Sequence, residues 1–119
     1  MEEFDIAIIG GGPAGIMAAI AASADLNVVL LEKNSSLGSK LLITGGGRCN
    51  ITNEKPIKKL LNSFHDKNFL KHSFYTFTNE MLLDLFRNRG LDFIVEDNNR
   101  VFPETEKSQD ILALSLIHI

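Results

Sequence analysis

A glycine-rich turn near the amino terminus carries the residue types best suited to hold a phosphate-containing ligand. It reads Gly10-Gly11-Gly12-Pro13-Ala14-Gly15, and its first, third and sixth positions fit the pattern G-x-G-x-x-G. In this pattern the first glycine allows a tight turn, the second lets a pyrophosphate approach the backbone, and the third lets a helix pack closely on a strand. The amide groups that open the following helix attract phosphate oxygens. The spacing therefore predicts a nucleotide-binding turn.

An acidic residue follows the glycine turn at the sequence spacing that is typical of ribose binding in dinucleotide-binding folds. Glu32 lies about 20 positions after Gly10, where an acid at the end of the second strand accepts hydrogen bonds from ribose hydroxyls. Lys33 comes directly after it. A glycine triplet alone is as often an ordinary tight turn as a ligand site. Strand, helix and acid in the correct order favour a dinucleotide site.

The elements that must position these residues form the start of a parallel sheet. The apolar run Ile6–Ile9 predicts a strand, Pro13 to about Ala24 predicts a helix with proline at its first position, and 27–32 predicts a second strand. This order predicts an α/β, Rossmann-like βαβ unit. Such a sheet needs further strands, and the apolar stretch 111–119 carries no closing signal. We therefore expect an incomplete domain, the amino-terminal piece of a longer protein.

A second glycine cluster lies in the long connection after the second strand. The run Thr44-Gly45-Gly46-Gly47-Arg48-Cys49-Asn50 stands within the polar segment 33–53, which we predict to be a functional loop without helix or strand. Bare glycine backbone can approach a flat or anionic ligand, and Arg48 could neutralise a pyrophosphate or a reduced flavin. A solvated glycine loop is the plainer alternative. Cys49 is either a redox or covalent group with a lowered pKa or, as we favour, a small packing residue.

Composition excludes several classes of function. The chain has 119 residues, of which 45% are hydrophobic and 23% charged, as expected for one small globular domain. A net charge of −3 argues against nucleic acid as the main partner. One cysteine permits no internal disulfide, and neither a secretory leader nor an apolar run long enough to span a bilayer is present. We expect a cytoplasmic protein with a small-molecule substrate and no metal, because His65 and His72 lack further ligands at a metal-binding spacing.

The rest of the chain predicts short helices, a strand pair and a last helix. We divide it into a βαβ unit with its glycine loop, 1–54, and a helical and strand segment on the substrate side, 55–119. The predicted elements are helices 55–64 and 68–74, a helix opened by Thr78 and stopped by Gly90, strands 91–95 and 100–102, and a helix from Gln109 capped by Ser108. The apolar residues predicted to face a core from the first two helices are Leu60, Leu61, Phe64, Phe69, Leu70 and Phe74.

Three segments together resemble a known family. The turn with its preceding strand, the run from Lys40 to Asn53, and Arg100–Pro103 are similar to the BaiN/YhiN-like flavoproteins, often labelled NAD(P)/FAD-dependent or aminoacetone-oxidase-like oxidoreductases. The resemblance covers the chain up to about Asp110. It implies an FAD-binding domain of the two-dinucleotide type with an inserted substrate-side domain.

The resemblance also implies roles for individual segments. It places the adenine-side pyrophosphate on Gly10–Gly15 and the ribose on Glu32, with Lys33 beside it. Lys40 and the run from Thr44 to Asn50 would lie along the pyrophosphate and towards the isoalloxazine, and Arg100–Pro103 would face the flavin from the substrate side. The family's characterised activity, known for few members, is flavin-dependent reduction of a carbon–carbon double bond conjugated to a ketone, and we do not carry that substrate over to this chain. The resemblance implies redox chemistry on a small organic substrate, with NAD(P)H as the possible electron donor. It assigns no catalytic residue, and Arg48 and Cys49 are the weak candidates.

Two other functions remain open at this point. The first fingerprint alone also fits an NAD-binding dehydrogenase domain, and the second glycine cluster favours FAD. The other alternative is a flavoprotein that binds FAD without catalytic turnover and is either redox-responsive or associated with RNA modification.

Overall fold

The computed structural model describes residues 1–117, which form two compact units. The first unit holds Met1–Cys49 and the segment from Lys107 onward, and the second holds Asn50–Glu106. The final helix thus belongs to the first unit, whereas the sequence-based division at residue 54 placed it with the second stretch. Among residues 1–117, no helix is both long and apolar enough to cross a bilayer.

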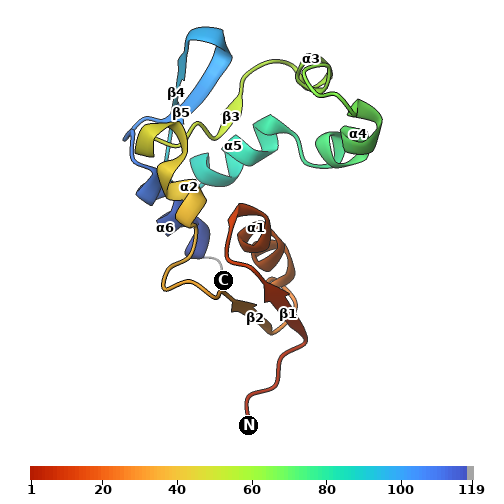
Figure 1. Ribbon diagram of the computed structural model, residues 1–119, viewed down its shortest axis with the longest axis vertical. Coiled ribbons are helices and arrows are strands. Elements are labelled where there is room, and N and C mark those ends of the chain that lie inside the picture. Colours follow the sequence, from red (N-terminus) through yellow and green to blue (C-terminus); the bar gives the residue numbers. More distant parts are fainter. Residues whose placement is uncertain (118–119) are drawn as a thin grey trace. The chain divides into compact units, whose positions relative to one another are not determined.

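The first unit begins with the predicted strand, helix and strand. Strand β1 (Ile6–Ile9) pairs in parallel with β2 (Val28–Leu31), and helix α1 (Pro13–Ala22) connects them (Figure 1). Proline at the start of α1 lacks an amide hydrogen where the helix has no partner for one. Ile16 and Ala19 are buried on α1, which packs against both strands. The α/β fold class with a parallel βαβ start is confirmed.

The connection after β2 contains secondary structure, so the prediction of a structureless loop was wrong. Helix α2 spans Ser39–Ile43, and a 3-10 turn, η1, spans Thr44–Gly47. Leu41 and Leu42 are half-buried on α2. A helix of a single turn is too short to show an amphipathic period, and the glycines on both sides of it favour a loop.

Helix α6 (Ser108–Leu116) packs against α1 and α2 in the first unit. Ser108 was predicted to cap this helix, which is wrong because the N-cap residue is Lys107. The Ser108 hydroxyl instead donates to the carbonyl of Leu42 at 2.7 Å. Since Ser108 is buried, its hydroxyl needs a partner, and the carboxyl end of α2 offers unpaired carbonyl groups.

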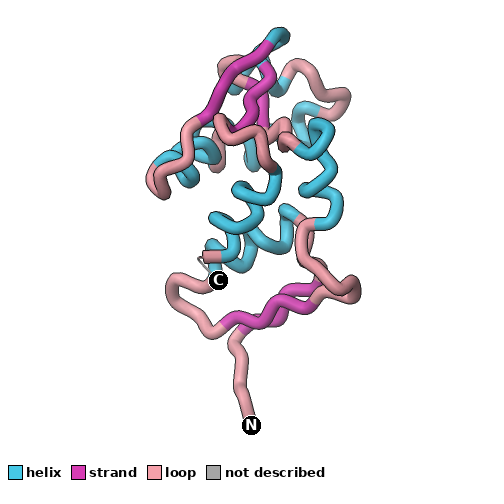
Figure 2. The backbone as a smooth tube through the Cα atoms, turned by 90° about the vertical axis from the view of Figure 1, so that its left-hand side faces the viewer, coloured by secondary structure: helices cyan, strands magenta, loops and turns pink. Residues whose placement is uncertain are grey.

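The second unit combines three helices with a small antiparallel sheet, whose strands are magenta in Figure 2. Strand β5 lies between β3 and β4, and Val101 of β5 stands opposite both Thr52 and Val95. The elements are β3 (Thr52–Asn53), α3 (Ile57–Leu61), α4 (Lys67–Thr76), α5 (Asn79–Arg87), β4 (Phe93–Glu96), the 3-10 turn η2 (Asp97–Asn99) and β5 (Arg100–Pro103).

Helices α3 and α4 pack on each other through a few apolar side chains. The rings of Phe64 and Phe74 meet edge to face at 5.2 Å, and Leu61 is buried. Phe69 was predicted to face a core, but it is 80% exposed. The two residues on α4 that turn inward are Leu70 and Phe74, four positions apart, and Phe69 lies off that stripe.

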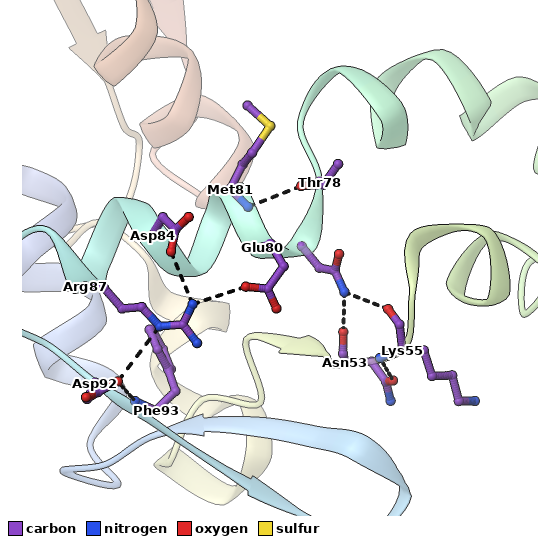
Figure 3. A network of polar contacts seen from close by, with 10 residues as sticks. Asn53, Lys55, Thr78, Glu80, Met81, Asp84, Arg87, Asp92 and Phe93 are labelled. Carbon is purple, nitrogen blue, oxygen red and sulfur yellow. Dashed lines mark hydrogen bonds and ion pairs between the residues drawn. The ribbon is translucent and has the colours of Figure 1, made fainter.

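Helix α5 has the caps that its sequence predicts. The Thr78 hydroxyl accepts from the Met81 amide at 3.2 Å, and Gly90 adopts φ 86° just beyond the helix. On the exposed side, Arg87 lies 3.2 Å from both Glu80 and Asp84 (Figure 3).

A buried amide ties the start of α5 to the sheet segment. The side-chain amide of Asn79 donates to the carbonyls of Asn53 at 2.7 Å and Lys55 at 2.9 Å. Asn79 is only 9% exposed, so these two bonds satisfy an otherwise costly buried group.

Candidate nucleotide-binding site

The glycine turn lies at the junction of β1 and α1, as the fingerprint requires. Gly10 adopts φ 104°, a conformation that side chains rarely allow, and its amide donates to the carbonyl of Leu31 at 2.8 Å. Gly12 is the N-cap of α1, and its carbonyl accepts the first bond of the helix from Ile16 at 2.9 Å. The turn is thus fixed to the end of β2 on one side and to α1 on the other.

The room for a side chain differs among Gly11, Gly12 and Gly15, and the differences match the roles that the pattern predicts. A Cβ built on Gly15 would lie 1.8 Å from the carbonyl oxygen of Gly10, and one on Gly11 would lie 2.1 Å from Leu37 Cδ2. A Cβ on Gly12 would meet nothing within 4 Å. Gly15 is therefore required for packing against the backbone, whereas a side chain on Gly11 would have to displace the end of the Leu37 side chain. Gly12 faces open space, where a ligand can approach the backbone.

The amino terminus of α1 is free to hold an anion. No side chain caps it among the described residues, and its first turn holds no acid. The opening amides of a helix lack partners within the helix, and at α1 these belong to Gly12, Ala14 and Gly15 because Pro13 has none. Together with the helix dipole, they suit the oxygens of a diphosphate.

Glu32 lies beside this turn, as its spacing predicted. Its Oε2 accepts from the Gly11 amide at 2.7 Å, and its Oε1 accepts from the Asn34 amide at 2.9 Å. The hydrogen bond from Asn34 lowers the pKa of the Glu32 carboxyl most, and the bond from Gly11 is the next largest cause. The positive charge of Lys33 adds to the effect. The group is therefore anionic at neutral pH, and each oxygen keeps a lone pair for a further donor such as a ribose hydroxyl.

Sequence reasoning missed a segment before α2 that contacts the glycine turn. The Gly38 amide donates to the carbonyl of Gly11 at 2.8 Å, and Leu37 packs on the bare face of Gly11. Gly38 itself adopts φ 68° directly before α2. A glycine just before a helix was the available signal, although its contact with the turn could not be read from spacing.

The second glycine cluster forms a left-handed backbone turn. Gly45, Gly46 and Gly47 all have positive φ, at 58°, 68° and 90°. A Cβ on Gly46 would meet nothing within 4 Å. The preceding Thr44 is exposed, and its hydroxyl donates to the carbonyl of Leu41 at 2.7 Å, which holds the turn on the end of α2. This segment presents open backbone, as a site for a flat or anionic group requires.

Cys49 ends the cluster as a buried residue. It is 1% exposed and adopts φ 62°. Burial raises the pKa of its thiol, although a hydrogen bond with Thr44 acts in the opposite direction. The thiol is therefore protonated at neutral pH, which favours the packing interpretation over a reactive thiolate.

The remaining candidates lie at other places. Lys33 and Lys40 are exposed in the first unit, and Arg48 is half-buried there. Asn50 belongs to the second unit, where its side-chain amide, with its oxygen and nitrogen assigned in the flipped orientation that satisfies both, donates to the carbonyls of Thr52 at 3.0 Å and Val101 at 3.3 Å.

Arg100–Pro103 forms β5 of the second unit. The guanidinium of Arg100 lies 5.6 Å from the centre of the Phe102 ring and 3.7 Å from Glu96, while Phe102 and Pro103 are buried. These contacts give the segment a structural role within its own unit.

A comparison with models of protein families shows to which family the chain belongs. The model of the HI0933-like protein Rossmann domain matches residues 4–119. The chain belongs to this family. The match confirms the family resemblance seen in the two glycine clusters, and it spans both units of the structure.

Individual relatives are longer enzymes. A 3-dehydro-bile acid delta(4,6)-reductase of Clostridium scindens is 36% identical over 92% of this chain and 27% of the relative. A ribosomal RNA dihydrouridine synthase of Escherichia coli is 34% identical over the same shares. A mitochondrial dihydrolipoyl dehydrogenase of Caenorhabditis elegans is 39% identical over 61% of this chain and 13% of the relative. The chain spans about a quarter of the length of the first two relatives.

Proposed function

We propose that this chain supplies the FAD-binding part of a flavin-dependent oxidoreductase. The observation that carries the proposal is the open amino terminus of α1 beside the anionic Glu32, with Gly12 facing free space. The residues present fit the nucleotide half of FAD. The opening amides of α1 would hold the diphosphate, and Glu32 would accept from a ribose.

FAD supplies hydride transfer when it is bound, and this chain positions and neutralises the cofactor. We assign Gly45–Gly47 to the backbone surface that receives the cofactor beyond its diphosphate, with Arg48 as the cation that offsets negative charge. Lys33 and Lys40 are exposed cations of the same unit that add to this field. Because Cys49 is protonated and buried, we give it no part in electron transfer.

The reaction class is redox chemistry on a small organic substrate, with NAD(P)H as electron donor. Relatives named as a reductase and a dehydrogenase support that class, although their printed substrates differ. We propose that the active enzyme is a longer polypeptide containing this chain, because these relatives extend far beyond the matched segment.

The test is a flavin titration of the full-length protein, with its absorbance spectrum and the rate of NAD(P)H oxidation. We expect stoichiometric FAD and a flavin that NAD(P)H bleaches. Glu32→Gln should weaken FAD binding about tenfold, as expected for losing about 1.4 kcal/mol from a charged hydrogen-bond acceptor. Glu54→Gln removes an equal charge from an exposed residue of the second unit, and it should leave the affinity unchanged.

Two outcomes would overturn the proposal. A colourless protein that binds NAD and cannot be reconstituted with FAD would identify an NAD-binding domain instead. A protein that holds FAD but oxidises no NAD(P)H with any acceptor would identify a flavoprotein that binds without turnover.

A further inference from the structure

Helix α2 links the two glycine segments of the proposed FAD site. Gly38 is its N-cap, and it ends at Ile43, shortly before the glycine run Gly45–Gly47. The position of α2 therefore decides where that run lies relative to the turn Gly10–Gly15. A helix of five residues has too few internal hydrogen bonds to be stable by itself, so its position is set by what it contacts.

A series of hydrogen bonds connects the glycine turn to α2. The Gly38 amide donates to the carbonyl of Gly11 at 2.8 Å, and the carbonyl of Gly38 accepts from the Leu42 amide at 2.9 Å. The carbonyl of Leu42 is among the last four of the helix, which have no partner within the helix. The carboxyl end of α2 therefore needs a donor from another segment.

Helix α6 supplies that donor. The Ser108 hydroxyl donates to the carbonyl oxygen of Leu42 at 2.7 Å, across 66 positions of the sequence. Since residues 50–106 belong to the second unit, this bond joins the two stretches of chain that make up the first unit. Ser108 is only 3% exposed, so little water can replace its hydroxyl if the side chain is shortened.

The carbonyl that Ser108 holds lies beside the second glycine run. A Cβ built on Gly47 would lie 3.9 Å from the carbonyl oxygen of Leu42. Gly47 adopts φ 90°, and the Cys49 amide closes the turn after it by donating to the carbonyl of Thr44 at 3.0 Å. Ser108 thus fixes a peptide group against which the glycine run is folded.

A second contact of α6 supports the other end of α2. Leu112 follows Ser108 by four positions, about one turn along α6, and a Cβ built on Gly38 would lie 2.9 Å from Leu112 Cδ1. Leu112 therefore packs on the bare face of the N-cap residue. Helix α6 lies beside α2 (Figure 1) and contacts both of its ends.

Another serine on α6 makes a hydrogen bond of the same length within its own helix. Ser115 is 6% exposed, and its hydroxyl donates to the carbonyl of Ile111 at 2.7 Å, four positions earlier. The two serines have similar burial and the same bond length, but Ser115 bonds to α6 itself and Ser108 bonds to α2. Ser115 is therefore a matched control for Ser108.

We propose that Ser108 is a positioning residue of the flavin site. By holding the Leu42 carbonyl, it fixes α2 and with it the run Gly45–Gly47, so that the backbone of this run and Arg48 keep their places for the cofactor. The role rests on the proposed function and deepens it, because it assigns part of the cofactor's environment to a residue far from both glycine clusters in the sequence.

The first test measures backbone amide hydrogen exchange in the full-length protein without cofactor. Ser108→Ala leaves the Leu42 carbonyl without its donor, so exchange at the amides of Gly38, Leu42 and Cys49 should become about tenfold faster. Ser115→Ala also removes a buried hydroxyl, but exchange at these amides should change less than about twofold, since a serine bonded within its own helix adds little to it. Equal acceleration in both variants would overturn the proposal by showing a general loss of stability.

The second test measures the dissociation constant of FAD and the reduction potential of the bound flavin. Ser108→Ala should weaken FAD binding about fivefold, as expected of a residue that acts on a site through others. It should also lower the potential, because backbone amides and a cation that are held less firmly stabilise the negative charge of reduced flavin less well. Ser115→Ala should alter neither quantity.

A further variant keeps the size of the side chain at this position. Ser108→Cys replaces the hydroxyl with a weaker donor, so it should change exchange, affinity and potential in the same directions as Ser108→Ala but less. It also tests the proposal if Ser108→Ala does not fold.

The outcomes separate this role from the proposed function. A wild-type protein that binds no FAD would refute the proposed function and the role of Ser108 with it. A wild-type protein that binds FAD, with unchanged affinity and potential in Ser108→Ala, would overturn the role of Ser108 alone.

Discussion

At Gly15, helix α1 approaches the turn so closely that only a hydrogen atom fits. A methyl group there would overlap the carbonyl of Gly10, whereas the same group on Gly12 would extend into free space. Both residues belong to one motif and one turn, yet they are required for different reasons. Gly15 serves the fold, and Gly12 serves the ligand.

This contrast predicts opposite behaviour for two alanine variants. Gly15→Ala should destabilise the chain by about 1–3 kcal/mol, because backbone atoms must move to admit the methyl group. Gly12→Ala should unfold at nearly the wild-type urea concentration, since its φ of −82° suits alanine, but should lose FAD affinity. Urea unfolding and FAD titration of both variants separate the effects. A Gly12→Ala protein with unchanged FAD affinity would place the diphosphate elsewhere.

Glu32 predicts a dependence of stability on pH. Because the folded carboxyl has a pKa below its ordinary value, the folded state favours the ionised form. This stabilisation is present above the unfolded pKa of about 4.3 and is lost as the pH falls through the lower, folded value. Thermal melts from neutral to acidic pH should therefore show a decline that is smaller in Glu32→Gln. If both proteins lose stability equally, the bonds to Gly11 and Asn34 do not favour the anion.

At the scale of elements, α5 depends on two kinds of contact at its amino terminus. Thr78 supplies a local cap, which its sequence position predicts, whereas Asn79 reaches carbonyls more than twenty residues away. The local cap is exchangeable with water, but the buried amide is not.

Alanine variants should rank these contacts. Asn79→Ala leaves two buried carbonyls without their donor and should cost about 2 kcal/mol, against about 1 kcal/mol for Thr78→Ala. Asn88→Ala, at the exposed carboxyl end of the same helix, should cost little. Urea denaturation of the full chain measures all three. A larger loss in Thr78→Ala than in Asn79→Ala would show that the long-range bonds contribute less than the cap.

The elements themselves were largely predictable, with informative exceptions. Strand β1 and the start of α1 follow from an apolar run, a proline and small residues that are contiguous in the chain. Helix α2 was missed because a single turn is too short to show a period. The inward position predicted for Phe69 was wrong because Leu70 and Phe74, four positions apart, form the inward stripe of α4 and Phe69 lies off it. Short elements are specified by what they pack against, which the sequence does not display.

At the scale of the whole molecule, the parallel pair β1–β2 leaves large apolar side chains in water. Ile9 is 86% exposed, Leu31 50% and Ile6 36%. Parallel strands are ordinarily covered on both faces, and open strand edges recruit other chains. The same strands also carry the turn and the carboxylate of the proposed FAD site.

We predict that the 119-residue chain self-associates in isolation and holds FAD weakly. Ile9→Lys should increase the monomer fraction in sedimentation velocity, because a charge on this strand opposes pairing. Val95→Lys, a matched change on β4 of the second unit, should have a smaller effect. A wild-type monomer that melts cooperatively with stoichiometric FAD would contradict this prediction.

The sequence by itself determined the βαβ start, the order of glycines and acid, the family and the caps of α5. All of these depend on residues close together in the chain or on fixed spacings between them. Only the tertiary structure decided that Glu32 also holds the Gly11 amide, that Ser108 bonds to Leu42 and that α6 joins the first unit. Those contacts link segments far apart in the chain, and their partners are chosen by burial and by unpaired backbone groups, which no local pattern encodes.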